Sequence, residues 1–111
     1  MKELVKALKA LSDETRLKIF RIILDNPDIC VCDIMGTLKM SQTRISRNLA
    51  TLKNAGLVDA RRDGQWIHYS AVRGNAYCAY LVKAVRNGVA PIAACVLCGR
   101  GKAGVDKNEK D

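Results

Sequence analysis

The sequence is poor in aromatic residues, in histidine and in long apolar runs, and each shortage excludes a class of structure or site. Aromatic residues make up 5% of the 111 residues, so the core has to be built from aliphatic side chains. No apolar run approaches the roughly 18 residues that a membrane-spanning helix needs, so we expect no membrane partner. The single histidine, His68, rules out zinc sites that are rich in histidine.

The sequence also lacks the motifs of an enzyme. No glycine-rich loop that could cradle a phosphate is present, and His68 has no cysteine, serine or acid beside it at the spacing of a catalytic motif. We therefore expect no catalytic residues, no enzymatic activity and no organic cofactor.

No secretory signal opens the chain, because residues 1–11 carry three lysines and a glutamate instead of an apolar segment. We expect a cytoplasmic protein in a reducing compartment. In that compartment closely spaced cysteines more often bind metals or undergo redox chemistry than form structural bridges. The sequence has five cysteines, at positions 30, 32, 78, 95 and 98.

Positive charge is abundant. Lysine and arginine number 19 against 11 acidic residues, which gives a formal net charge of +8. A basic balance this strong in a short chain favours a polyanionic partner, although charge alone can also serve solubility. Seven basic residues lie between Lys39 and Arg73, against Asp59 and Asp63, and this clustering favours double-stranded DNA.

Apolar residues at helical spacing predict five helices, separated by capping and turn residues. We expect Ser12 to cap the second helix, Ser41 to cap the fourth, and Gly56 to end the fourth in a left-handed conformation. In the fourth helix the inward face consists of Ile45, Leu49 and Leu52. The predicted helices cover residues 3–11, 13–25, 31–38, 42–54 and 75–87.

Two short segments after the fourth helix have strand character. Residues 57–62 and 65–72 flank Asp63-Gly64, a strong hairpin signal, and predict a two-stranded wing. The predicted fold is therefore mainly α with a β-hairpin wing, a winged helix-turn-helix. We expect one DNA-binding and dimerisation domain over residues 1–98, followed by a disordered tail over residues 99–111.

The fourth helix fits the major groove of DNA, and its polar faces carry groups that bind phosphates or base edges. Arg44 and Arg47 can reach phosphate or guanine, while Gln42 and Asn48 can contact adenine. An ordinary solvated helix face is the alternative interpretation. The predicted DNA-binding residues are Ser41, Gln42, Thr43, Arg44, Ser46, Arg47 and Asn48, with Arg61 and Arg62 from the wing.

Cys30 and Cys32 are the strongest candidates for a metal site, because thiolates select soft ions. In a regular helix two residues at this spacing point about 200° apart, whereas in an extended segment they point the same way. A chelate therefore needs a non-helical start to the third helix, and we expect binding to unwind that first turn or hold it open. The alternative is that both thiols are small buried apolar groups.

The remaining cysteines and the histidine carry weaker signals. Cys95 and Cys98 form a C-x-x-C pair that could complete a site with Cys30 and Cys32, undergo redox chemistry or remain unused. Cys78 lies on an apolar helix face and is interpreted as a packing residue. His68 is expected at the surface of the wing or facing DNA.

The segments ICVCDI, SQTRISRNLATLKNAGLV and RRDGQWIHYS resemble the ArsR–SmtB family of metalloregulatory repressors, in particular its arsenic(III)-responsive members. The resemblance covers residues 3–87. It implies a homodimer that binds operator DNA and dissociates from it when an inducer binds. We expect helices 3–11 and 75–87 to form the subunit contact, because their apolar stripes exceed what one small domain needs to cover.

By this resemblance Cys30 and Cys32 are thiolate ligands for arsenic(III) or antimony(III). A third helix cysteine often found in the family is replaced by Met35, so Cys95 or Cys98 is a possible third ligand. Asn48 stands where a histidine is usual, so base preference can differ. Three alternatives stay open: a thiol redox switch, a repressor responsive to another soft metal such as cadmium or lead, and a DNA-binding module with a structural zinc.

Overall fold

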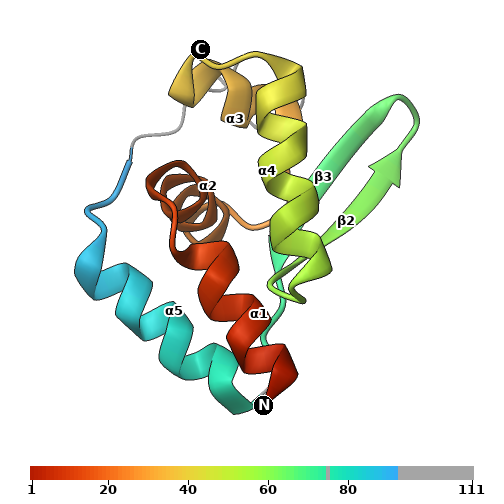
Figure 1. Cartoon of the computed structure of the whole chain (residues 1–111). Helices are drawn as coiled ribbons and strands as arrows, with labels where there is room; N and C mark the ends of the chain where they lie inside the picture. The colour runs from red at the N-terminus through yellow and green to blue at the C-terminus, as the bar shows by residue number, and fades with distance from the viewer. Residues whose placement is uncertain (75, 93–111) are drawn as a thin grey trace.

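The computed structural model describes residues 1–74 and 76–92. Within them, five helices surround a common core and a small sheet extends from the helices as a wing (Figure 1). The elements are α1 (Lys2–Leu11), α2 (Glu14–Asp25), β1 (Ile29–Cys30), α3 (Val31–Leu38), α4 (Gln42–Asn54), β2 (Val58–Asp63), β3 (Trp66–Ala71) and α5 (Ala76–Gly88).

The helix boundaries follow from local capping. Ser41 caps α4 as predicted, since its hydroxyl oxygen accepts a hydrogen bond from the Arg44 backbone N–H at 3.2 Å. The prediction that Ser12 caps α2 was wrong. Asp13 takes that role by accepting from the Arg16 backbone N–H at 3.1 Å, while the Ser12 hydroxyl donates to the Lys9 carbonyl and closes α1.

The core is aliphatic, as the shortage of aromatic residues predicted. Phe20 is the one aromatic side chain among the fully buried residues of the described chain. The inward face predicted for α4 is confirmed, because Ile45, Leu49 and Leu52 have no exposed surface. They pack with α2 and α3 residues in a single cluster that fixes the angle between the helices of the helix-turn-helix.

The wing has three strands, not the two predicted. The β2–β3 hairpin turns at Gly64, whose φ of +63° suits glycine, and Asp63 pairs with Trp66 on either side of the turn. The short strand β1 pairs antiparallel with β3, so the sheet order is β1-β3-β2. The segment that carries Cys30 is therefore an edge strand of the wing.

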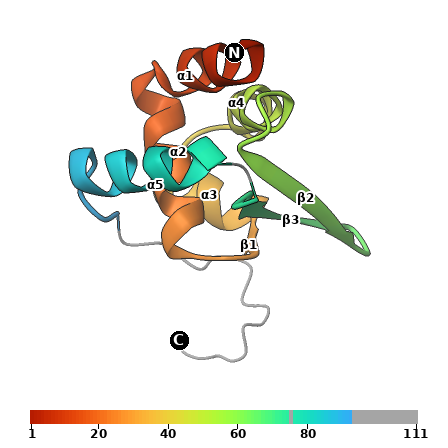
Figure 2. The same ribbon diagram turned by 90° about the horizontal axis from the view of Figure 1, so that it is seen from below.

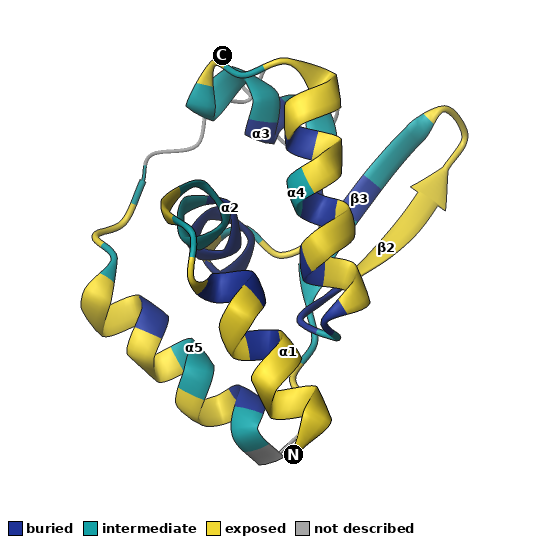
Figure 3. Ribbon diagram, in the orientation of Figure 1, coloured by how far each residue is buried: buried dark blue, intermediate teal, exposed yellow. Residues whose placement is uncertain are grey.

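The wing projects away from the helices, whereas α5 lies on the opposite side of the molecule (Figures 1 and 2). Figure 3 shows that α1 is exposed along much of its outer surface. Three apolar side chains of α1 are exposed there: Leu4, Val5 and Leu8. Tyr80 of α5 is exposed too. Among the described residues, every helix is too short or too polar to cross a membrane.

Candidate functional site

The turn between α3 and α4 sets the geometry of the helix-turn-helix. Lys39 ends α3 in the left-handed conformation, with φ of +56°, and the chain then enters α4 at the Ser41 cap. Ile34 of α3 and Ile45 of α4 are both fully buried in the shared core. The two helices therefore meet through apolar contacts, and the polar faces of α4 are turned to solvent.

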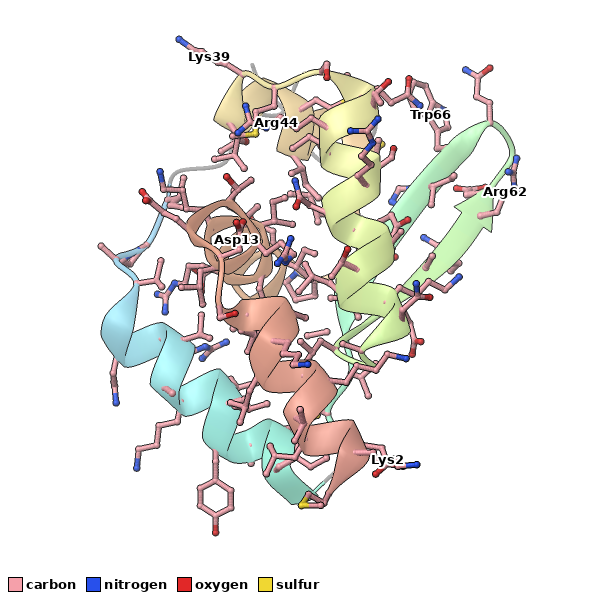
Figure 4. The ribbon with its side chains drawn as sticks, viewed as in Figure 1. Lys2, Asp13, Lys39, Arg44, Arg62 and Trp66 are labelled. Atoms are coloured by element: carbon pink, nitrogen blue, oxygen red, sulfur yellow. The ribbon has the colours of Figure 1, made fainter. Side chains whose placement is uncertain are left out.

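The predicted DNA-binding residues of α4 are nearly all on that exposed surface. Figure 4 shows Lys39, Arg44 and Arg62 toward the same end of the molecule, away from Lys2. The surface thus combines the start of α4 with the wing, which is where a basic winged helix-turn-helix would meet DNA. The exposed residues of this surface on α4 and its cap are Ser41, Gln42, Thr43, Arg44, Ser46 and Arg47.

Asn48 differs from these residues because it is half-buried and its amide is engaged within the protein. Its oxygen accepts a hydrogen bond from Arg16 at 3.3 Å, and its nitrogen donates to the Arg44 carbonyl at 3.0 Å. A contact between Asn48 and adenine would require both hydrogen bonds to break. The geometry gives Asn48 a role in holding α4 against α2.

The wing presents Arg61 and Arg62 to solvent on β2. Arg61 is held by Asp28, whose carboxylate accepts from Nη2 at 2.6 Å and from Nε at 3.2 Å. The hydrogen bonds to this carboxylate raise the pKa of Arg61 above its usual value, so the guanidinium stays charged. Arg62 makes a longer contact, from Nη1 to the Gly64 carbonyl at 3.5 Å, at the tip.

Cys30 and Cys32 meet although one lies in a strand and the other in a helix. Cys30 ends β1 and caps α3 with an extended backbone, φ −77° and ψ 145°, while Cys32 lies in the first turn of α3. The two sulfur atoms are 3.1 Å apart. The non-helical start required for a chelate is present at Cys30, and the effect of ion binding on the first turn of α3 stays a prediction.

His68 corrects another expectation, since it is a buried residue of β3 with 5% of its surface exposed. It pairs with Cys30 across the sheet, and its Nδ1 lies 3.0 Å from the Asp28 carbonyl oxygen. Because a carbonyl only accepts, Nδ1 carries the proton of this hydrogen bond. The segment that carries Cys30 and Cys32, called the thiol segment below, is thus linked to the wing by residues that lie 40 positions apart in the sequence. The sequence pattern did not reveal this contact.

The other cysteines divide into two groups. Cys78 is buried, as expected of a packing residue, while Cys95 and Cys98 lie outside the described residues. In residues 1–74 and 76–92, no three His, Cys, Asp or Glu side chains are grouped so that they could hold a metal ion. Within the described residues the candidate site therefore consists of the Cys30 and Cys32 sulfur atoms.

These features define a class of protein: a winged helix-turn-helix with an exposed basic surface on α4 and the wing, and with two cysteine sulfurs close together at the start of α3. A family profile for bacterial regulatory proteins of the arsR family matches residues 13–60. A homodimeric winged helix-turn-helix DNA-binding domain from Mycobacterium bovis, named as a possible ArsR-family transcriptional regulator, is 30% identical, with a TM-score of 0.67. The likeness covers 78% of each chain.

The chain belongs to the ArsR family. It is 43% identical to the arsenical resistance operon repressor of Escherichia coli K12 over 65 residues. The matched region covers 59% of this chain and 56% of that repressor. It is 37% identical over 68 residues to the cadmium resistance transcriptional regulatory protein CadC homolog of Staphylococcus aureus, which covers 61% of this chain and 56% of the relative. The chain thus spans about half the length of these curated relatives. Both relatives are named as regulators, and neither is named as an enzyme.

Proposed function

We propose that this chain is a transcriptional repressor that binds operator DNA as a homodimer. In this proposal arsenic(III) or antimony(III) binds the thiolates of Cys30 and Cys32 and releases the repressor from DNA. The observation that carries the proposal is the convergence of the two sulfur atoms, 3.1 Å apart, directly before the helix-turn-helix.

The donor type supports a soft inducer. Thiolates prefer soft ions over hard ones, and the two sulfur atoms already lie close enough for one ion to bridge them after a small side-chain adjustment.

A pyramidal ion has room for a third thiolate, and the described residues group no third ligand with the pair. We assign this position to Cys95 or Cys98. Cys95→Ser or Cys98→Ser should weaken arsenite binding if the replaced cysteine is the third ligand. Equal affinity in both single variants and in the double variant would limit the site to two thiolates.

DNA binding is supported by the exposed basic side chains of α4 and the wing, which Figure 4 shows at one end of the molecule. Arg44, Arg47 and Arg62 supply charge for phosphates, and the polar residues at the start of α4 supply groups for base edges. A dimer would present two copies of this surface, so the operator should be an imperfect palindrome with half-sites about one helical turn, or a multiple of it, apart.

Dimerisation is supported by apolar surface left uncovered on α1. Leu4, Val5 and Leu8 are 38%, 43% and 49% exposed along one face, and Tyr80 of α5 is 76% exposed. A single chain gains nothing from exposing these side chains to water. A second copy that covers them with its own α1 and α5 would bury apolar surface on both chains.

The site determines how release could occur. Cys30 belongs to the wing sheet through its pairing with His68, whereas Cys32 belongs to α3, which packs on α4. An ion bound by both sulfurs therefore fixes the wing relative to the helix-turn-helix. If that arrangement differs from the one that fits DNA, the ion lowers DNA affinity by the difference in its binding free energy to the two states.

The test is fluorescence anisotropy of the reduced protein on its upstream DNA, titrated with arsenite. Coupling in the usual range predicts a rise in the DNA dissociation constant of about 5- to 150-fold. Cys30→Ser should bind DNA like the wild type and lose this response. Cys78→Ala is the matched control, because it removes a thiol from α5 and should leave the response intact. Normal release of Cys30→Ser by arsenite would refute the site assignment.

A second candidate function keeps the repressor and changes the signal. Two sulfurs 3.1 Å apart would also suit a thiol redox switch, and a related chain is named for cadmium resistance. Parallel titrations with cadmium, lead and diamide separate these possibilities. Release by diamide without metal, with a new disulfide detected by mass spectrometry, would establish the redox signal instead, and release by cadmium or lead alone would establish another soft metal.

A further inference from the structure

Asp28, two residues before Cys30, has an unusual backbone conformation. Its φ is +62°, in the left-handed region that non-glycine residues rarely adopt, although aspartate and asparagine tolerate it better than most. Such a conformation persists when surrounding contacts hold it. At Asp28, residues of the wing supply contacts of this kind.

Each polar group of Asp28 binds a different wing residue. Its backbone N–H donates to Ser70 Oγ at 3.1 Å, and its carbonyl oxygen accepts from His68 Nδ1 at 3.0 Å. Its carboxylate accepts from Nε and Nη2 of Arg61. Ser70 and His68 belong to β3 and Arg61 to β2, so this one residue ties the thiol segment to both long strands.

The pair with Arg61 has a geometry that positions the guanidinium. Because Nε and Nη2 are both engaged, the ring-like double hydrogen bond fixes the plane of the group, and Nη1 remains directed away from the carboxylate. Both side chains are about half exposed, so the pair adds little to stability. Its effect is on orientation.

We propose that Asp28 is a positioning residue that transmits occupancy of the Cys30–Cys32 site to Arg61, one of the two wing arginines predicted to contact DNA. The inference rests on the proposed function. Only Ile29 separates Asp28 from Cys30, so a movement of Cys30 toward a bound ion shifts the Asp28 carboxylate, and Arg61 moves with it. The wing then changes its fit to the phosphates independently of any change in α4.

The decisive variant is Asp28→Asn, since asparagine tolerates the same backbone conformation and removes the charge that holds Arg61. Asp59→Asn is the matched control: Asp59 is an exposed acid on β2, so it changes the charge of the wing equally without touching the thiol segment. Urea unfolding of both variants should resemble that of the wild type.

The first measurement is the ratio of DNA dissociation constants with and without arsenite. Asp28→Asn should lower this ratio at least fivefold, which corresponds to about 1 kcal/mol of coupling, while arsenite still binds with wild-type stoichiometry. Asp59→Asn should keep the wild-type ratio. An unchanged ratio in Asp28→Asn, or an equal fall in both variants, would overturn the proposal.

The second measurement needs no DNA. Trp66 is the only tryptophan of the chain and lies beside the wing turn, so its emission reports on the wing. Arsenite should change this emission in the wild type and in Asp59→Asn, and much less in Asp28→Asn. If the wild type binds arsenite but keeps its DNA, the proposed function fails, and the Trp66 response alone then decides the role of Asp28.

Discussion

Replacing Arg44 by alanine should change the salt dependence of DNA binding by an amount that can be calculated. Each neutralised phosphate contributes about −0.9 to the slope of log affinity against log salt. A dimer loses two such contacts, so the slope should become shallower by about 1.8. When salt rises from 50 to 200 mM, the ratio of wild-type to variant affinity for DNA should therefore fall by about twelvefold.

The assay is anisotropy on one DNA duplex at four or five salt concentrations. Lys83→Ala is the control, because Lys83 is exposed on α5, on the side of the molecule away from the wing (Figure 1). It removes the same charge and should leave the slope unchanged. An unchanged slope in Arg44→Ala, with a loss of affinity confined to one DNA sequence, would refute the phosphate assignment and indicate a base contact.

Three further outcomes are expected. Ser41→Ala should reduce the free energy of unfolding by about 0.5–2 kcal/mol in urea, since it leaves the Arg44 N–H of the first turn of α4 without its cap; a stabilised variant would contradict the capping role. Leu8→Lys should shift the protein toward monomer in analytical ultracentrifugation, whereas Lys18→Gln on α2 should not, and a fully dimeric Leu8→Lys would place the subunit contact elsewhere. Burial raises the pKa of Tyr69 above its usual value, so the folded protein keeps the phenol proton to higher pH than the unfolded chain. This contribution to the free energy of unfolding is present below the pKa of the unfolded state and is lost as pH rises through the pKa of the folded state. Between about pH 9 and 11, the free energy of unfolding measured in urea should therefore fall more steeply with pH in the wild type than in Tyr69→Phe.

Local signals predicted the helix-turn-helix well. The structure confirms the expected boundaries of α3 and α4, because both are set by neighbours in sequence: the left-handed turn at Lys39, the Ser41 cap and Gly56, which has φ of +77°. The error at Ser12 was also local, since two capping residues stand next to each other there. Asp13 prevails because its carboxylate reaches the Arg16 N–H.

Non-local contacts account for what the sequence did not reveal. The strand β1 has only two residues and forms because Ile29 meets Tyr69, far along the chain. The burial of His68 and the hydrogen bonds from Arg61 to the Asp28 carboxylate depend on the same strand pairing. The DNA-binding and metal-binding assignments stay predictions, because they concern partners that the fold alone does not contain.

The side chain of Arg16, on α2, links two other helices. Its Nε donates to the Ala10 carbonyl at the end of α1 at 2.6 Å, and its Nη1 donates to the Asn48 side chain on α4. A substitution at Asn48 would remove the α4 acceptor of Arg16 Nη1, while Nε of the same guanidinium holds the end of α1, the helix with the uncovered apolar face. One side chain of α2 therefore couples the position of α4 to that of α1.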